Sequence, residues 1–201
     1  MTTTLRERVR AGDPAAFGEL FDQSARRVYN HAYRLLGDWT AAEDAVSLTF
    51  LEAWRCRDRV DAEGGDLLPW LLGIATNTAR NTARARRRHA SAMARLPGPI
   101  DEPDFAEELA GRLDDLDTAR AVQEALSRLR RPEREVVALC VYAGLDYAAA
   151  AEALGVPVGT VRSRLSRARA HLREARLPEG GERQEHVRSV SGGSLSRKEN
   201  S

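Results

Sequence analysis

Apolar residues recur along most of the chain at intervals of three and four, the spacing that lines one face of an α-helix. No stretch alternates between apolar and polar residues regularly enough to predict a strand. The first long helix is expected to begin at Asp13-Pro14, because aspartate caps helices and proline suits the first helical position, and to end at Gly37. A break near Ser24 stays open. The apolar residues of this helix are Phe17, Leu20, Phe21, Val28, Ala32, Leu35 and Leu36.

Two more helices are predicted in the first half of the chain. One would run from a capping-box pattern, Thr40 with Glu43, to about Arg55, with the apolar residues Ala42, Ala45, Val46, Phe50, Ala53 and Trp54. Pro69 is expected to open the other, whose buried residues would be Trp70, Leu71, Ile74, Ala75 and Thr78. The apolar pattern then fades, so residues 1–92 are interpreted as one domain.

The rest of the chain divides into a linker, a second domain and a tail. Residues 93–116 contain several prolines and many acidic side chains, which predicts a flexible acidic linker. Residues 117–177 are interpreted as a second helical domain, with helices at 118–130, 132–143, 147–154 and 158–174. Residues 178–201 offer almost nothing to bury and are predicted to be disordered. The predicted fold is therefore all-α, with two small helical domains joined by an acidic linker.

Charge is distributed unevenly, although the 201 residues carry a net charge of only +1. Arginines gather in residues 80–95 and again in residues 158–176, with six in the second block. Between these blocks, residues 101–117 carry eight acidic side chains and one arginine. The two basic blocks indicate two surfaces for an anionic partner, which the overall charge conceals.

Residues 145–172 give the strongest local signal. A short helix, a tight turn at Gly155-Val156-Pro157 and a longer arginine-rich helix follow one another, the order of a helix-turn-helix whose second helix enters the DNA major groove. Arg162 and the small residues would face the bases, and the other arginines the phosphates. The alternative is a solvated helix in an ordinary bundle. The side chains predicted to contact DNA are Gly159, Thr160, Arg162, Ser163, Arg164, Ser166, Arg167 and Arg169.

The segment from Gly144 to Arg173 resembles the promoter-reading C-terminal domain of the extracytoplasmic-function (ECF) sigma factors of bacterial RNA polymerase. Its specific part is VGTVRSRLSRAR, from Val158 to Arg169. The resemblance covers about residues 5–92 and 117–176. In the first half, the motifs DPAAF, LLGD, AEDA, FLEAW, PWL and IATN occur in the order expected of the family's polymerase-binding domain, beginning at Asp13, Leu35, Ala42, Phe50, Pro69 and Ile74.

The chain departs from the family's usual pattern at three positions. Ser47 stands where the family often has glutamine, and Thr49 where it often has an acid. Pro157 replaces a more usual polar capping residue. These departures concern details of the polymerase contact and of the start of the DNA-reading helix, rather than the family.

The helix that ends at Arg55 carries an unexpected second face. Leu48 and Leu51 lie on it, away from the apolar residues of the predicted core, which is typical of a partner surface. The resemblance implies that the coiled coil of the polymerase clamp binds there. The alternative is that the two leucines meet the preceding helix. The residues predicted to bind polymerase are Asp44, Ser47, Leu48, Leu51 and Arg55.

The helix opened by Pro69 has a polar face rich in amides and arginines. Amides hydrogen-bond base edges, and arginines hold phosphates and stack on bases. The resemblance implies that this face binds the promoter −10 element as a melted single strand, while the helix 158–174 reads the −35 element as a duplex. It also implies that the loop 57–68 captures a flipped base. The residues predicted for the −10 element are Asn77, Arg80, Asn81, Arg84 and Arg88.

By the same resemblance, the acidic linker passes through the positively charged cleft of the polymerase and keeps the two domains apart. The alternative is that it is simply solvated. The partners implied are core RNA polymerase, through its clamp coiled coil and its flap, together with promoter DNA and an anti-sigma factor.

Catalysis is not expected, because no convergent set of reactive groups is recognisable. Lys198, the only lysine, lies in the tail, which argues against a phosphate-binding Walker loop. The four histidines are scattered without metal-ligand spacing, so no metal or cofactor is predicted. Cys56 and Cys140 are interpreted as reduced thiols. No apolar run approaches the length of a membrane span, and no signal peptide is recognisable. We therefore expect a cytoplasmic protein that does not insert into a membrane.

Two rival functions remain to be distinguished. A stand-alone helix-turn-helix regulator would bind duplex DNA by itself, commonly as a dimer on palindromic half-sites. That reading leaves the motifs of the first half unexplained. A helical adaptor that binds only proteins is the second rival, and the arginines of residues 162–169 argue against it.

Overall fold

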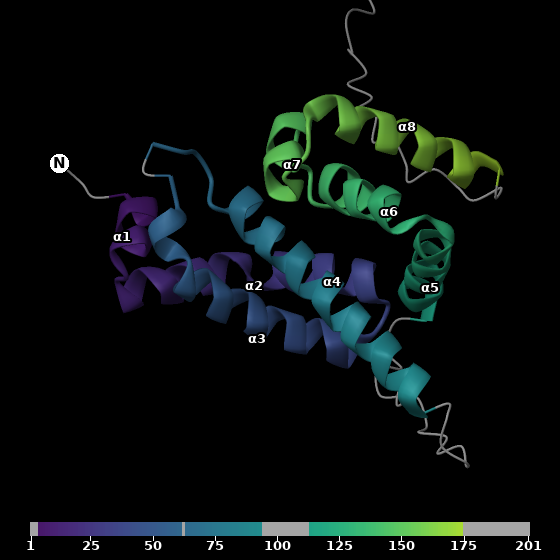
Figure 1. The fold of residues 1–201 in the computed structure, drawn as a ribbon, viewed down its shortest axis with the longest axis horizontal. Helices are drawn as coiled ribbons and strands as arrows, with labels where there is room; N and C mark the ends of the chain where they lie inside the picture. Colours follow the sequence, from purple (N-terminus) through teal and green to yellow (C-terminus); the bar gives the residue numbers. More distant parts are fainter. Residues whose placement is uncertain (1–3, 62, 94–112, 175–201) are drawn as a thin grey trace, which may run out of the picture.

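The computed structural model describes residues 4–61, 63–93 and 113–174, with side chains from residue 120 onward in the last range (Figure 1). Every regular element in these ranges is a helix, and no strand occurs in them. The all-α prediction is confirmed. Most of the predicted linker and the whole predicted tail lie outside the described residues.

The first half of the chain is a bundle of three long helices with a short helix at one end. α1 (Leu5–Ala11) leads into α2 (Pro14–Leu36), which packs against α3 (Trp39–Arg55) and α4 (Leu68–Met93), while the 3₁₀ turn η1 (Arg57–Arg59) contacts α1. Figure 1 shows α2, α3 and α4 side by side. Buried apolar side chains on these three helices include Leu20, Val28, Ala42, Ala45, Leu71 and Ala75.

The predicted start and end of α2 are confirmed. The Asp13 carboxylate accepts a hydrogen bond from the backbone N–H of Ala15 at 2.9 Å. Arg8 bonds the same carboxylate at 2.8 Å and lowers its pKa. The helix runs past a buried Ser24 without a break and ends at Gly37, whose φ of 70° suits glycine.

The start of α3 differs from the predicted capping box of Thr40 and Glu43. Asp38 caps the helix instead, because its carboxylate accepts the backbone N–H of Ala41 at 2.7 Å. Arg86 of α4 holds the other carboxylate oxygen at 2.6 Å. Thr40 therefore lies inside the first turn, and the Thr40–Glu43 prediction is wrong.

The second half contains α5 (Leu113–Arg128), α6 (Arg131–Val137), a π-helical turn η2 (Ala138–Tyr142), α7 (Tyr147–Leu154) and α8 (Val158–Glu174). The predicted bounds of the last two helices are confirmed. α5 begins before residue 117, so it takes up the last residues of the predicted linker.

The π-helical turn replaces the end of the helix predicted for 132–143. Its marker is the hydrogen bond from the Ala143 N–H to the Ala138 carbonyl, five residues back, at 3.0 Å. The turn exposes Val141 and holds Tyr142 under the guanidinium of Arg34, 4.3 Å from the ring centre. A cation–π contact between Arg34 and Tyr142 therefore links this turn to α2.

The two halves share one continuous core in place of the predicted separation. A single cluster of buried apolar residues includes Leu71 and Leu72 of α4 together with Leu139, Leu154 and Val161 of the second half. The closest approach is between α4 and α7. The expectation that the linker keeps the domains apart is therefore wrong for this structure, because both halves bury apolar surface against each other.

His31 is a buried histidine that joins α2 to α4. Its Nε2 lies 2.8 Å from Thr76 Oγ1, and that hydroxyl donates its own hydrogen to the Leu72 carbonyl. The Nε2–H must therefore be the donor to Thr76, which leaves Nδ1 bare, buried and without a hydrogen-bond partner. Burial, and secondarily the charge of Arg34, lower the pKa of His31 from 6.5 to about 3.

Acid is expected to destabilise the fold through His31. The histidine stays neutral in the folded chain but takes up a proton in the unfolded chain. The stability that neutral His31 contributes is therefore fully present above pH 6.5 and is lost as the pH falls towards 3. Between pH 8 and pH 5 the free energy of unfolding should fall by about 2 kcal/mol from this group alone. Urea unfolding at several pH values measures the loss, and His31→Gln should remove that part. An equal pH dependence in both chains would contradict the assignment.

Candidate polymerase- and DNA-binding surfaces

α7 and α8 form a helix-turn-helix whose turn is fixed by local bonds. The Asp146 carboxylate accepts the Ala149 N–H at 2.7 Å and so caps α7, and Gly155 ends it with a φ of 64°. The Val156 N–H then bonds the Ala151 carbonyl at 3.0 Å, and Pro157 leads into α8. The inner faces of the two helices bury Ala150, Ala151, Leu154, Val161, Leu165 and Ala168.

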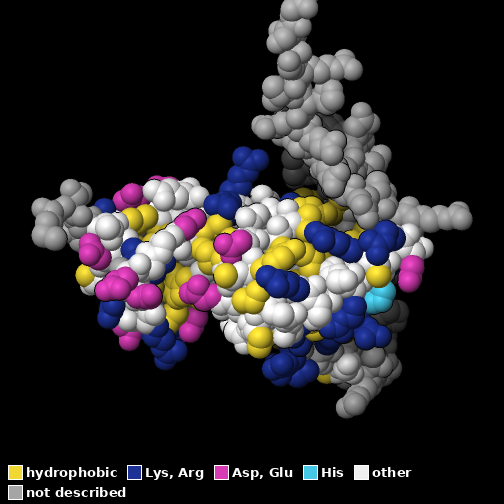
Figure 2. All heavy atoms as spheres, turned by 90° about the horizontal axis from the view of Figure 1, so that it is seen from above, with side chains coloured by type: hydrophobic (Ala, Val, Ile, Leu, Met, Phe, Trp, Pro, Cys, Tyr) yellow, Lys and Arg dark blue, Asp and Glu magenta, His cyan; other side chains and the backbone are white. Residues whose placement is uncertain are grey.

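The outer face of α8 carries all the residues predicted to read the −35 element. Thr160 and Arg164 are half-buried. Arg167 donates to the Ser163 carbonyl at 3.2 Å, which holds its side chain along the helix. In Figure 2 most arginines gather over one half of the visible surface, and most acidic side chains over the other. The exposed residues of this face are Gly159, Arg162, Ser163, Ser166, Arg167 and Arg169.

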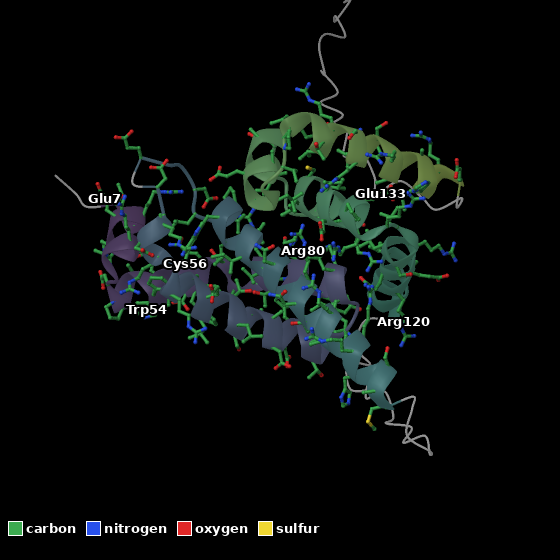
Figure 3. The ribbon with its side chains drawn as sticks, in the orientation of Figure 1. Glu7, Trp54, Cys56, Arg80, Arg120 and Glu133 are labelled. Atoms are coloured by element: carbon green, nitrogen blue, oxygen red, sulfur yellow. The ribbon has the colours of Figure 1, made fainter. Side chains whose placement is uncertain are left out.

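α8 is anchored to α6 by a polar pair that the sequence pattern did not predict. His171 Nδ1 lies 3.1 Å from a carboxylate oxygen of Glu133, a residue that is 3% exposed (Figure 3 labels Glu133). The same carboxylate accepts the Arg130 N–H at 3.2 Å and helps to cap α6. The pair could not be predicted because nothing in the sequence indicates that Glu133 is buried.

The predicted −10 face of α4 is only partly free. Asn77, Asn81, Arg84 and Arg88 are exposed, as expected. Arg80, in contrast, donates two hydrogen bonds to the buried carboxylate of Glu135 on α6, from Nε at 2.7 Å and from Nη2 at 2.6 Å. These bonds raise the pKa of Arg80. Four of the five predicted residues are therefore open to solvent, and the fifth is engaged within the chain.

The second face of α3 is exposed in the part of the chain that the structure describes. Leu48 and Leu51 are 48% and 47% exposed, and neither is among the buried or partly buried residues of the core clusters. About half of each side chain is therefore open to a partner. Asp44, Ser47 and Arg55 are exposed beside them, so all five residues predicted for polymerase binding lie at the surface.

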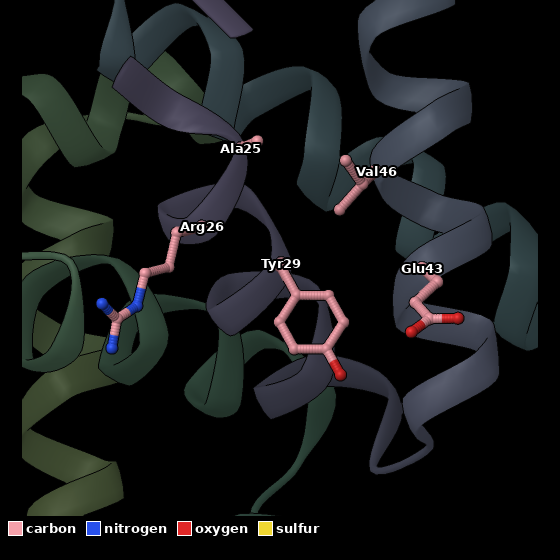
Figure 4. Close-up of a pocket in the computed structure, with 5 residues that line it drawn as sticks. All are labelled: Ala25, Arg26, Tyr29, Glu43 and Val46. Carbon is pink, nitrogen blue, oxygen red and sulfur yellow. The ribbon is translucent and has the colours of Figure 1, made fainter. Parts of the chain in front are cut away.

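A shallow depression of about 320 Å³ lies between α2 and α3 (Figure 4). Ala25, Val46 and the ring of Tyr29 line it, and Figure 4 shows Arg26 and Glu43 on opposite sides of that ring. No set of reactive or metal-binding groups converges there.

No metal-binding cluster of His, Cys, Asp or Glu occurs among the described residues. Burial raises the pKa of the Cys56 and Cys140 thiols, which disfavours the reactive thiolate. None of the described helices has the length and apolar character that a membrane crossing requires.

Comparison with known families gives two matches, in the order of the two predicted domains. Residues 20–89 match the family model described as Sigma-70 region 2. Residues 119–172 match the model described as Sigma-70, region 4. The first match contains α3 and most of α4, and the second contains the helix-turn-helix.

Solved structures give the same assignment. CnrH, solved in complex with the cytosolic domain of CnrY, is similar with a TM-score of 0.64 and 27% identity over 85% of this chain and 94% of that one. The sigma factor RpoE of Bartonella quintana, solved with the anti-sigma factor NepR, is similar with a TM-score of 0.59 and 28% identity over 79% and 94%.

Sequence relatives align with most of the chain. The ECF RNA polymerase sigma factor SigK of Mycobacterium bovis is 31% identical over 171 residues, which is 84% of this chain and 90% of SigK. The RNA polymerase sigma factor CarQ of Myxococcus xanthus is 34% identical over 170 residues, 84% of this chain and 93% of CarQ. With both sigma regions present in order and an exposed arginine face on the second, the chain belongs to the ECF family of RNA polymerase sigma factors.

Proposed function

We propose that the chain binds core RNA polymerase and directs it to promoters by reading a −10 and a −35 element. The observation that carries this function is the α8 surface: a helix-turn-helix whose second helix turns arginines and small residues outward, within a chain that also has a sigma region 2. Such a helix suits the major groove, where arginine reads base edges and binds phosphates.

Each of the three candidate surfaces has its own partner. The exposed leucines of α3 bind the polymerase clamp, the polar face of α4 holds the −10 strand after melting, and α8 reads the −35 duplex. The second domain also meets the polymerase flap. The protein itself catalyses nothing, and phosphodiester bond formation belongs to the polymerase.

An anti-sigma factor is proposed as a further partner. The sigma factor RpoE of Bartonella quintana was solved with the anti-sigma factor NepR, and CnrH with the cytosolic domain of CnrY; both align with most of this chain. A chain that acts on promoter DNA and polymerase works in the cytoplasm, where both are found.

A pull-down with purified bacterial core polymerase, followed by run-off transcription on a promoter library, tests the function. Stable binding and new start sites that share two spaced elements are expected. Failure to bind the polymerase, together with tight duplex binding by the chain alone, would favour a stand-alone regulator instead.

A further inference from the structure

The loop before α4 is tied to the short helix α1. This loop, residues 60–61 and 63–67, connects η1 to α4 and forms most of the loop 57–68 predicted from the sequence. Val60 and Leu67 anchor its two ends, at 2% and 5% exposed, while the described residues between them are exposed. Figure 1 shows α1 at the same end of the bundle, where it contacts η1. Core packing therefore cannot fix the exposed part of the loop, which depends on polar contacts instead.

Arg6 of α1 makes these contacts with three backbone carbonyl groups of the loop. Its Nη1 donates to the Asp61 carbonyl at 2.6 Å, its Nε to the Gly65 carbonyl at 2.9 Å and its Nη2 to the Asp66 carbonyl at 3.1 Å. The nitrogens of a guanidinium lie in one rigid plane, so the three carbonyls are held in one arrangement, and the charge of the donor strengthens each bond. We call these three hydrogen bonds the Arg6 fork.

α1 is itself firmly placed, so it can support the loop. A capping box closes its start: the Thr4 hydroxyl accepts the Glu7 N–H at 3.2 Å, and the Glu7 carboxylate accepts the Thr4 N–H at 2.8 Å. Val9 is fully buried, and Leu5 packs against the core. α1 precedes residues 20–89, which match Sigma-70 region 2, so that match gives α1 no role.

Gly64 makes room for the guanidinium of Arg6. A Cβ atom at this position would lie 2.5 Å from Nη1 and 2.7 Å from Cζ of Arg6. Gly64 is not among the glycines with a positive φ, so the close approach of Arg6, rather than the backbone conformation, explains the missing side chain. At the adjacent Gly65 a Cβ would meet nothing within 4 Å. The loop therefore has one glycine that the Arg6 fork requires and one that it does not.

The Arg6 fork also determines which groups the loop turns outward. The carbonyl and the N–H of a trans peptide point in opposite directions. Because the Gly65 and Asp66 carbonyls face Arg6, the N–H groups of Asp66 and Leu67 point away from it. Asp61 and Glu63 add exposed side chains, and the Asp61 carboxylate accepts the Glu63 N–H at 3.1 Å. Hydrogen-bond donors and carboxylate acceptors are the groups that read base edges.

We propose that Arg6 is a positioning residue for −10 recognition: the Arg6 fork holds the loop before α4 in the conformation in which its outward groups contact a base of the −10 strand. The inference rests on the proposed binding of that strand along α4, since the loop leads directly into this helix. Arg6 itself touches no DNA. It limits the conformations of the loop beforehand, so that ordering the loop does not weaken the contact with the correct base.

Two variants release the loop by different routes, and each has a matched control. Arg6→Ala removes the three bonds, and Arg10→Ala removes an exposed arginine of the same helix. Gly64→Ala retains Arg6 but displaces its guanidinium, because the end of an arginine side chain can move and the new Cβ cannot. Gly65→Ala adds the same methyl group one residue further on, where space is open.

Release of the loop is measured on the full chain with a glutamate-specific protease, by following cleavage after the exposed Glu63 with mass spectrometry. Arg6→Ala and Gly64→Ala should be cut at this bond about tenfold faster than the wild-type chain, because local opening exposes it. Both controls should be cut at the wild-type rate, and the urea midpoint of all four should stay close to that of the wild-type chain. Wild-type cleavage in both release variants would overturn the inference.

The effect on recognition is measured by run-off transcription with the polymerase holoenzyme, on a promoter and on templates substituted singly at each −10 and −35 position. Both release variants should discriminate about tenfold less well at one −10 position and as well as the wild-type chain at the −35 positions. An equal loss on every template would indicate a purely structural role and overturn the inference. If the wild-type chain discriminates at −10 and both variants retain this, the inference fails alone; if the wild-type chain ignores the −10 sequence, the proposed function fails with it.

Discussion

A chain in which Leu48 and Leu51 are both replaced by aspartate is expected to bind core RNA polymerase about a thousandfold more weakly. Central apolar side chains of an interface commonly contribute about 2 kcal/mol or more each, and about 4 kcal/mol corresponds to that factor. The two leucines are half-exposed and lie outside the clusters of buried core residues, so the fold should survive the change. Affinity is measured by titrating fluorescently labelled core enzyme.

Met93→Asp is the control for this experiment. Met93 is an apolar residue at the end of α4, 40% exposed, so the same charge is introduced at a similarly accessible site away from α3. It should bind polymerase as the wild-type chain does. Unchanged affinity in the double leucine variant would mean that α3 does not provide the polymerase surface.

Replacing Arg162 and Arg164 by alanine is expected to remove recognition of the −35 element. Contacts from arginine to base edges or phosphates contribute about 1–3 kcal/mol each, so the double variant should bind its promoter duplex at least about thirtyfold more weakly. Each lost phosphate contact should also lower the slope of log affinity against log salt by about one. Gel-shift titration of the polymerase holoenzyme at several salt concentrations measures both.

Arg120→Ala serves as the arginine control, because Arg120 is an exposed side chain of α5 and Figure 3 shows it well away from α7. Its salt dependence should match that of the wild-type chain. Promoter binding that survives the loss of Arg162 and Arg164 at moderate salt would mean that α8 is not the reading helix.

Local signals made the helix-turn-helix predictable from the sequence. The cap at Asp146, the left-handed Gly155 and the Pro157 that follows act over a few residues, so the bounds of α7 and α8 agree with the prediction. The outward position of the α8 arginines follows from helical periodicity alone. Exposure of the α3 leucines was predicted in the same way, from their place off the apolar face.

Contacts between distant residues could not be predicted. Arg80 and Glu135 are 55 residues apart, and each looks like an ordinary surface residue in its own helix. At the start of α3, Asp38 and Thr40 both fit the capping position, and the prediction from sequence chose Thr40 where the structure has Asp38. α4 also buries Leu72 and Ala79, which lie outside its predicted apolar residues; they share one side of the helix with Thr76, which bonds His31 of α2.

The π-helical turn has a consequence for the orientation of the DNA-reading helix. An α-helix rotates by about 100° per residue, so one residue more or less between α6 and α7 changes the direction in which everything after it faces. With residues 138–142 wound as they are, α7 crosses α4 at Gly73 while the arginines of α8 point to solvent. Shortening this turn by a single residue would rotate the arginine face of α8 away from its present direction without altering any residue that is proposed to touch DNA.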